Sequence, residues 1–433
     1  MRRLATRSVG LAVSTTRNVR WASATPEQRL LKLEEQVSEL EKRCESLEQC
    51  ESTFRFYANI PRTPLVLEEV VRRCADRNYQ PHVFCHRELP IMLAHLMKHL
   101  EALPCGLSAM PAIRFVRGIL YSCLSRLAAA PLPTTTALEE EFIKVVQAID
   151  EEIEPTLTLM AKGVLELRRE VTKHRRAVYS RANKRMPRED FRAEYRSLIQ
   201  KALDDYNSIL IQFKFLSRQL CSLNPNDTRY IGLIDTELDI VETTSNAIHE
   251  AKEVCLEHFG DSPEVNIVIP EGQRPSPFPH WGESISYAVK ELMKNALRAT
   301  VERHMKRNES GIVDCDDMPP ITVTIAGGDI SDHCCVCICD EGGGIPRHDM
   351  EKVLSYTFTT TQNPLLLGDD ADTDRSESRE EETAGALAGY GYGLPMSCMY
   401  ARCFGGNLQL QSMEGFGTKA FLHIRRTSVL DLR

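Results

Sequence analysis

Four short motifs that could build a nucleotide site follow one another in the second half of this 433-residue chain. The first pairs Glu291 with Asn295, four residues later. If this stretch is a helix, both side chains share one face with Arg298 and Glu302. A carboxylate and a carboxamide one turn apart can present oxygen atoms to a hard cation and to a hydroxyl group. Taken alone, the same polar stripe would also suit a solvated helix face.

The second motif is an aspartate at the end of an expected strand, followed by glycines. Asp340 precedes Gly342, Gly344 and Ile345, and the glycines would let the backbone approach a ligand closely. The carboxylate could accept a hydrogen bond from an exocyclic amine such as that of adenine. A plain turn would also explain this short piece.

The third and fourth motifs are glycine-rich turns. The third precedes an expected helix at 395–404 and consists of Gly389, Tyr390, Gly391, Tyr392, Gly393 and Leu394. Backbone N–H groups at a helix start, and the positive end of the helix dipole, favour phosphate. The fourth turn ends in Thr418, which offers a hydroxyl group. Before the third motif, residues 362–388 are rich in acidic side chains and predict a mobile lid.

A mixed sheet with helices on one face is expected to position these motifs. Alternating apolar residues predict strands at 265–269, 321–325, 335–339, 408–410 and 420–424. A helical stretch lies between the first two strands, at 283–307. This order of elements predicts an α/β sandwich. Cys334 and Cys337 would point to opposite faces of their strand, so we expect buried thiols rather than metal ligands.

The first half of the chain predicts a helical bundle over residues 53–225. Apolar residues recur at helical spacing from 64 to 130, and again over 138–172 and 190–222. Breaks in the first of these stretches are expected at Pro81, Pro90, Pro104 and Pro111. The fold class is therefore α+β, with an N-terminal bundle followed by an α/β domain over residues 226–433.

Two smaller features of the bundle can also be predicted from the sequence. One of the three threonines at 134–136 can cap the helix that follows them. His95 and His99 lie one helical turn apart, but no third ligand is near them in sequence. We therefore expect these histidines to be ordinary core or surface residues rather than a metal site.

The amino terminus resembles a targeting segment. Residues 1–22 are rich in arginine and hydroxyl side chains and contain no acidic residue, which is typical of a mitochondrial presequence. A disordered basic tail is the alternative. Over residues 27–50, apolar residues at alternating spacings of three and four predict either a short coiled coil or an amphipathic helix packed on its own domain.

The overall composition excludes several classes of protein. The net charge is −8, which argues against a general nucleic-acid binder because phosphate binding requires a basic surface. The 15 cysteines are scattered and too sparse for a disulfide scaffold. No stretch has the apolar density of a membrane span.

The four motifs, in this order, resemble those of the Bergerat ATP-binding fold, the superfamily that includes DNA gyrase and the histidine kinases. Residues 294–300 and 391–395 look like the mitochondrial protein kinases of 2-oxo acid dehydrogenase complexes, and so does the stretch from Glu88 to His95. The resemblance covers residues 53–426. It implies a Bergerat-type kinase domain preceded by a regulatory, partner-binding bundle.

The resemblance also implies a role for each motif. Glu291 would be the general base that takes the proton of a substrate serine, and Asn295 would coordinate Mg²⁺ on the phosphates of ATP. Asp340 would bind the adenine amine, with Thr418 beside it. The other residues that this resemblance assigns to the nucleotide site are Arg298, Gly342, Gly344, Ile345, Thr359, Thr360, Gly389, Tyr390, Gly391, Tyr392, Gly393 and Leu394.

Partners and location follow from the same resemblance. Such a kinase would phosphorylate the E1 component of a pyruvate or branched-chain 2-oxo acid dehydrogenase complex and thereby inhibit it. Its bundle would dock a lipoyl domain of the E2 core, which raises the local concentration of kinase near E1. A homodimer in the mitochondrial matrix is expected, with no nucleic acid partner and no membrane span.

Some residues depart from the family pattern. Glu341 stands where the family usually has an arginine after the aspartate, and Lys214 replaces an arginine of the last bundle helix. Trp21 and Trp281 are the only tryptophans, so the Asp-Trp pair in the tail of pyruvate dehydrogenase kinases is missing and dimer contacts of that kind are not expected.

The preferred complex stays open at the level of sequence. Residues 358–360 and 408–412 look more like the branched-chain kinase. Residues 412–415 and 400–402 look more like the pyruvate dehydrogenase kinases.

Two rival functions remain open at this level. A histidine kinase would need a phosphoacceptor on a helix before the ATP domain, where His249 lies. A scaffold that binds ATP and the lipoyl core without phosphorylating anything is suggested by Glu341 and the acidic segment 362–388.

Overall fold

The computed structural model describes residues 50–63, 67, 69–70, 73, 80–181, 193–224, 226–307, 317–328, 331–358 and 391–426. The chain divides into two compact units, Met1–Arg55 and Phe56–Arg433. In the first unit only residues 50–55 are described, and there Arg55 pairs with Glu51 across one helical turn at 3.0 Å. The expected presequence 1–22, and residues 27–49 of the expected coiled coil, lie outside the described residues.

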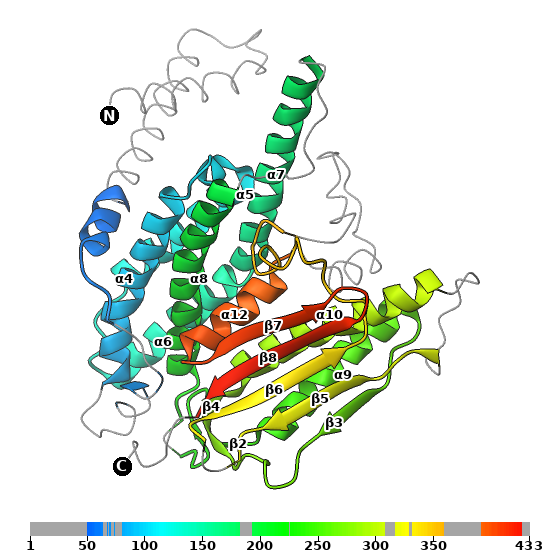
Figure 1. Cartoon of the computed structure of the whole chain (residues 1–433). Helices are drawn as coiled ribbons and strands as arrows, with labels where there is room; N and C mark the ends of the chain where they lie inside the picture. The colour runs from blue at the N-terminus through cyan, green and yellow to red at the C-terminus, as the bar shows by residue number, and fades with distance from the viewer. Residues whose placement is uncertain are drawn as a thin grey trace, which may run out of the picture. The chain divides into compact units, whose positions relative to one another are not determined.

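The amino-terminal part of the second unit is a bundle of long helices (Figure 1). They are α4 (Pro81–Glu101), α5 (Pro111–Ala129), α6 (Thr136–Ile153), α7 (Thr156–Arg181) and α8 (Ala193–Cys221), with a single 3-10 turn, η2 (Leu107–Ala109), before α5. α8 packs against α4 and α6 and is buried almost continuously in its second half, mostly through apolar side chains. The expected bundle is confirmed.

Prolines mark the helix boundaries less uniformly than the sequence suggested. Pro81 and Pro111 begin α4 and α5, where a missing N–H costs nothing. The break expected at Pro90 is wrong, because this residue lies buried inside α4, where its neighbours Leu89 and Ile91 are also buried. We attribute the continuity to apolar burial, which offsets the lost hydrogen bond. Pro155, by contrast, separates α6 from α7 within the periodic stretch 138–172.

The expected threonine cap is confirmed. The Thr135 hydroxyl accepts a hydrogen bond from the Leu138 N–H at 3.4 Å and caps α6. Burial lowers the pKa of His95, whose Nε2 lies 2.9 Å from the Ile60 carbonyl oxygen. Among the described residues, no group of three His, Cys, Asp or Glu side chains is arranged to hold a metal ion.

The carboxy-terminal part contains a five-stranded sheet in the order β3-β5-β6-β8-β7. Its strands are β3 (Val265–Val268), β5 (Ile321–Ala326), β6 (His333–Asp340), β7 (Asn407–Met413) and β8 (Gly417–Arg425). β3 and β5 run parallel and the other neighbours run antiparallel, so the sheet is mixed, as expected.

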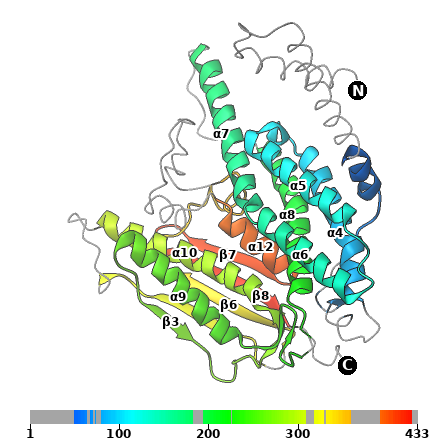
Figure 2. The same ribbon diagram turned by 180° about the vertical axis from the view of Figure 1, so that it is seen from behind.

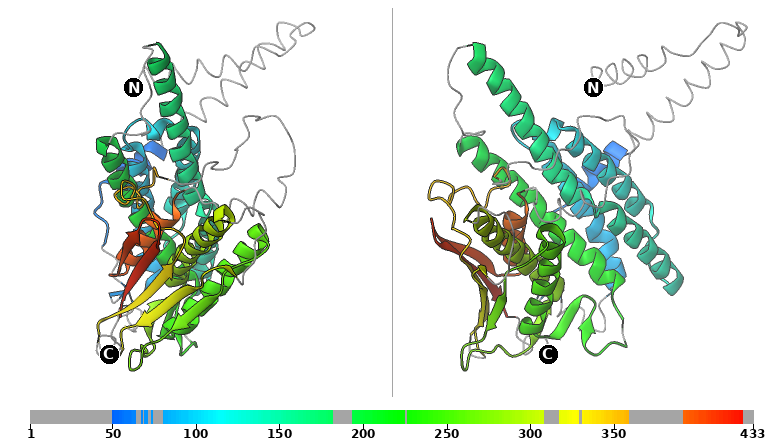
Figure 3. Two further views of the ribbon diagram at one scale, coloured as in Figure 1. Left: turned by 45° about the vertical axis from the view of Figure 1, so that its right-hand side comes forward. Right: turned by 90° about the vertical axis from the view of Figure 1, so that its right-hand side faces the viewer.

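Three helices cover one face of this sheet (Figures 2 and 3). They are α9 (Ile240–Phe259), α10 (Gly282–Arg307) and α12 (Gly393–Cys403). Buried side chains from alternate strand positions, such as Val323, Val336 and Leu422, form one core with these helices. The α+β fold class is therefore confirmed. Cys334 points into this core while Cys337 lies on the other, partly exposed face, so the two thiols cannot share a metal.

A smaller sheet was not anticipated from the sequence. It joins β1 (Tyr230–Ile231), β2 (Ile234–Leu238) and β4 (Phe278–Trp281) in antiparallel order. β4 has no alternating pattern because all four of its residues are buried, including Pro279 and His280. Its last residue, Trp281, packs against Phe215 of α8 with ring centroids 5.4 Å apart, so this strand joins the bundle to the sheet-containing half.

None of the helices in the described part of the chain is long and apolar enough to cross a membrane.

Lys214, which stands where the family usually has arginine, donates to Glu154 at 2.9 Å. Arg218 completes this network through Asp150, Glu154 and Glu283 at 2.8, 2.5 and 3.0 Å. The substitution at 214 therefore keeps a cation in an ion-paired position.

Candidate nucleotide-binding site

A pocket of about 370 Å³ lies between α10, the end of β6, the loop after β6 and strands β7 and β8. Eight of the residues expected from the sequence line it: Asn295, Arg298, Asp340, Gly342, Gly344, Ile345, Leu394 and Thr418. The structure thus brings together members of all four motifs, which are far apart in sequence. A volume of this size suits a small organic ligand rather than a single ion.

The polar end of the pocket is built on a strand pairing. Asp340, the last residue of β6, is directly opposite Thr418 of β8. Its Oδ1 accepts hydrogen bonds from the N–H groups of Gly342 at 2.8 Å and Thr418 at 3.3 Å. Both bonds involve the same oxygen, so Oδ2 is the atom that can accept from a ligand amine. Burial raises the pKa of the Asp340 carboxyl.

The glycines after Asp340 are required by packing as well as by any ligand. A β-carbon on Gly342 would lie 2.5 Å from the β-carbon of Ala299 on α10. Gly344 has φ +73°, a left-handed conformation, and a β-carbon there would overlap the Met413 carbonyl oxygen. The loop can therefore lie flat against α10 and β7, which forms the wall of the pocket.

Ser412 is a site residue that the sequence analysis missed. Its hydroxyl accepts a hydrogen bond from the Ile345 N–H at 2.7 Å and lies 3.0 Å from the Thr418 hydroxyl. It therefore holds the loop after β6 to the β7–β8 pair. A serine on an exposed-looking strand gives no distinctive signal, so only the strand register identifies it.

Arg303 is a second residue that sequence reasoning missed. It lies on α10, lines the pocket, and donates to the carbonyl oxygens of Glu341, Gly415 and Phe416, the second of these at 2.7 Å. One guanidinium thus fastens the loop after β6 and the turn between β7 and β8 to α10. The Glu341 side chain is exposed and does not line the pocket. The charge reversal at 341 therefore does not place a carboxylate in this pocket.

Asn295 has the chemistry expected of a magnesium ligand. Its side-chain nitrogen donates to the Glu291 carbonyl oxygen at 2.9 Å, which leaves the amide oxygen as the acceptor at the pocket. Mg²⁺ in nucleotide sites commonly takes one or two protein oxygens and completes its shell with phosphate and water. A site with one carboxamide oxygen fits that pattern.

Glu291 lies on the same helix but does not line the pocket. Its carboxylate pairs with Lys294 at 2.5 Å and packs directly against Gly393 at the start of α12. The side chain is largely buried, with 16 % of its surface exposed. Behind it, Tyr287 and Tyr400 have ring centroids 4.7 Å apart, and burial, assisted by the charge of Glu291, raises the pKa of Tyr287.

The glycine repeat is described only in part. Gly391 has φ +79°, and Tyr392 is the N-cap residue that directly precedes α12. The Tyr392 ring is buried against Tyr356, with ring centroids 4.7 Å apart, so this side chain serves packing. Any contact with phosphate here would come from the backbone. Thr359, Thr360, Gly389, Tyr390 and the expected lid at 362–388 lie outside the described residues.

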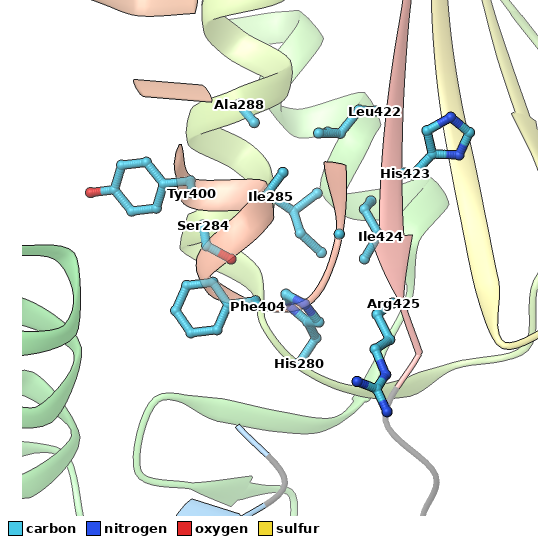
Figure 4. Close-up of a pocket in the computed structure, with 12 residues that line it drawn as sticks. His280, Ser284, Ile285, Ala288, Tyr400, Phe404, Leu422, His423, Ile424 and Arg425 are labelled. Carbon is cyan, nitrogen blue, oxygen red and sulfur yellow. The ribbon is translucent and has the colours of Figure 1, made fainter. Parts of the chain in front are cut away.

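A second hollow, shown in Figure 4, does not compete for a nucleotide. It lies between the end of β4, the start of α10, the end of α12 and the end of β8, and its volume is only about 10 Å³. His280 and Phe404 pack there with ring centroids 5.9 Å apart. Burial lowers the pKa of His280 to about 4, so the imidazole is neutral at physiological pH.

His249 does not occupy the position that a histidine kinase requires. It lies on α9, which packs against α10 and is part of the layer covering the sheet. Its side chain is exposed and faces Glu253 at 3.4 Å. The phosphoacceptor of the rival hypothesis would thus sit inside the ATP-binding layer rather than on a separate helix.

The sheet, its helices and the pocket define a known class of ATP-binding domain. Residues 282–428 match the family described as "Histidine kinase-, DNA gyrase B-, and HSP90-like ATPase". Residues 67–235 match the family described as "Mitochondrial branched-chain alpha-ketoacid dehydrogenase kinase". The Bergerat resemblance and the resemblance of the bundle are both confirmed.

Whole-chain relatives narrow the assignment. A mitochondrial [pyruvate dehydrogenase (acetyl-transferring)] kinase of Arabidopsis thaliana is 33% identical over 79% of this chain and 84% of its own length. The corresponding kinase of Drosophila melanogaster is 28% identical over 86% of this chain and 84% of its own length. Pyruvate dehydrogenase kinase isozyme 1 of Rattus norvegicus is 27% identical over 86% of this chain and 79% of its own length. The chain therefore belongs to the mitochondrial dehydrogenase kinase family and is an ATP-dependent protein kinase.

Proposed function

We propose that this kinase transfers the γ-phosphoryl group of Mg-ATP to a serine of the E1 component of a 2-oxo acid dehydrogenase complex in the mitochondrial matrix, and thereby inhibits the complex. The observation that carries the proposal is the convergence of Asn295, Asp340 and Thr418 on one pocket, with Glu291 one turn before Asn295. The relatives are named as pyruvate dehydrogenase kinases, which supports the pyruvate complex as the source of E1. The family that matches the bundle is named for the branched-chain complex, which supports that complex instead.

Each site residue has a defined task in this proposal. The carboxylate of Asp340 and the hydroxyl of Thr418 orient the adenine, and Asn295 holds the metal. When bound, Mg²⁺ neutralises charge on the phosphate oxygens. Glu291 accepts the proton of the serine hydroxyl at a carboxylate oxygen, and its ion pair with Lys294 fixes the position of that carboxylate. The start of α12 supplies backbone N–H groups near the phosphates.

The partners are part of the proposal. The bundle would dock a lipoyl domain of E2 and so hold the kinase close to its E1 substrate. A homodimer is proposed from the resemblance to the family. Residues 53–225 and 226–433 are the proposed partner-binding and catalytic regions, with 362–388 as a lid over the nucleotide.

Phosphoryl transfer can be tested directly with the purified full-length chain. It would be incubated with ATP, with or without Mg²⁺, and with purified E1 of the pyruvate or the branched-chain complex, and phosphoserine would be measured. We expect Mg²⁺-dependent labelling of one E1. ATP binding without labelling of either E1 would contradict the proposal and support the scaffold hypothesis.

The metal ligand has its own test. Asn295→Ala should abolish the part of ATP affinity that depends on Mg²⁺, because the carboxamide oxygen is lost at the pocket. Calorimetric titrations of ATP with Mg²⁺ and with a chelator would measure this. Equal Mg²⁺ dependence in the variant and the parent protein would remove Asn295 from the proposed metal site.

A further inference from the structure

The carboxy-terminal half of α7 is a basic helix that the proposed function does not use. α7 has 26 residues and is about 39 Å long. Its first half is packed: Met160, Val164 and Leu167 are buried, and a β-carbon on Gly163 would lie 2.5 Å from Ile113 of α5. After Leu167 none of the α7 residues whose burial is described is buried. Figures 1 to 3 show this end of α7 extending beyond the neighbouring helices.

The charge of this segment is opposite to that of the chain. Residues 168–181 contain six arginine or lysine residues and one acidic residue, Glu170, whereas the whole chain has a net charge of −8. A cluster of this density has a cost, since like charges on one helix repel each other. This end of α7 projects from the bundle, so packing against α5 does not offset the repulsion between these charges.

Three of these cations lie along one side of α7 together with Lys162, which precedes the segment. Lys162, Arg169, Lys173 and Arg176 follow each other at intervals of seven, four and three residues, which places them on one helix face over about 21 Å. The last three are exposed. No described residue forms an ion pair with Arg169, Lys173 or Arg176. We call Arg169, Lys173 and Arg176 the α7 stripe.

We propose that the α7 stripe docks a partner protein through an acidic surface, on which carboxylates recur at about one helical turn. The regular spacing of the three cations matches a helix that carries Asp or Glu every three or four residues. Complementary charge patterns of this kind accelerate association and fix the register of the two partners. The docking surface lies outside the nucleotide pocket and is a function separate from phosphoryl transfer.

Other polyanions fit the observations less well. A helix that lies on a membrane usually has a broad apolar face with Trp, Phe or Leu, and residues 168–181 contain none of these. A nucleic acid would meet the negative charge of the remaining chain beyond the stripe. A partner protein needs to be acidic only where it contacts the stripe, so the rest of its surface need not be negative.

The test uses the full-length chain and a synthetic helical peptide with glutamate at every third or fourth position. A peptide with glutamine at the same positions is the control ligand. The stripe variant is Arg169→Glu, Lys173→Glu, Arg176→Glu. The matched control variant, Arg114→Glu, Lys144→Glu, Lys201→Glu, reverses three exposed cations on α5, α6 and α8 and changes the net charge equally. Thermal unfolding of each variant checks folding, and Arg169→Gln, Lys173→Gln, Arg176→Gln replaces the stripe variant if that one unfolds.

We expect the glutamate peptide to bind the parent and the control variant alike, and to bind the stripe variant at least about tenfold more weakly. Binding should weaken as salt is raised, and the glutamine peptide should not bind. Vesicles of phosphatidylcholine with phosphatidylglycerol, and a DNA duplex, are tested in parallel. Stripe-dependent binding to either of these in preference to the peptide would overturn the proposal. So would equal loss in the control variant, or no binding of the glutamate peptide.

Discussion

The carboxylate of Glu291 lies directly against the α-carbon of Gly393, so a β-carbon at position 393 would overlap Oε2 of Glu291. This contact joins the proposed general base on α10 to the first residue of α12. Glycine at 393 therefore lets the proposed catalytic carboxylate and the proposed phosphate-binding backbone lie side by side.

The first prediction concerns this contact. Gly393→Ala should displace either Glu291 or the start of α12, because overpacking of this kind costs about 1–3 kcal/mol. We expect phosphorylation to fall by about tenfold or more, since a small misplacement of a catalytic group is costly. Gly118→Ala on α5 is the matched control, because a β-carbon at that position would have nothing within 4 Å of it. Equal activity of the two variants in a steady-state kinase assay would show that the contact is unimportant.

The second prediction concerns the proton. Glu291→Gln preserves the shape of the side chain but removes its ability to accept a proton. Phosphorylation should therefore fall by about 10²–10⁴-fold, while ATP affinity stays close to that of the parent protein because Glu291 does not line the pocket. Single-turnover kinetics and ATP titration measure the two quantities separately. Full activity of this variant would remove Glu291 from the chemical step.

Regular periodicity explains which parts of the fold the sequence predicts well. The alternation Ile321, Val323, Ile325 predicts β5 because one face of the strand is buried in the core and the other is not. β4 lacks such a signal, since both of its faces are buried. Pro90 suggests a helix break because local rules cannot include the burial of its neighbours in the bundle.

The residues of the site also divide into those that the sequence predicts and those that it does not. Asp340 and Thr418 could be predicted because they belong to motifs with a recognisable spacing. Arg303 could not, since its importance arises from three carbonyl oxygens that approach it only after β6, β7 and β8 have paired. The position of Glu291 beside Gly393, rather than on the pocket wall, likewise depends on how α12 packs against α10.

The third prediction concerns the buried carboxyl of Asp340. Its pKa is raised by burial in the folded protein, so the native state loses stability as the pH rises from the ordinary aspartate pKa through the raised one. At a pH below both pKa values, the carboxyl is protonated in the folded and the unfolded chain. It then does not lower the stability of the native state. Asp340→Asn keeps an oxygen that can accept from Gly342 and Thr418 but is neutral at every pH.

Asp340→Asn should therefore unfold at a higher temperature than the parent protein at about pH 8, with the difference shrinking towards about pH 4. Thermal unfolding followed by circular dichroism across this range measures the effect. ATP affinity should fall by about 10–100-fold, because a hydrogen bond to a charged acceptor is lost. A variant that is less stable than the parent at about pH 8 would show that the ionised carboxylate stabilises the fold.

The fourth prediction concerns Arg303, which holds the turns after β6 and before β8 to α10 through three carbonyl oxygens. Each such hydrogen bond contributes about 0.5–1.5 kcal/mol, and partial exposure reduces the total. Arg303→Ala should therefore weaken ATP binding by about tenfold, because the pocket wall is no longer fixed. Arg303→Lys should recover only part of the loss, since an ammonium group lacks the planar fork that reaches several acceptors.

Arg307→Ala, one turn further along α10 and exposed, provides the matched control for the loss of positive charge. ATP titration calorimetry gives the affinities, and hydrogen exchange of residues 341–346 and 413–417 reports whether the turns have loosened. In Arg303→Ala we expect faster exchange in both turns together with the weaker binding. Weaker binding without faster exchange would mean that Arg303 acts on the nucleotide by its charge, whereas parent-like affinity would show that the three carbonyl contacts do not shape the pocket.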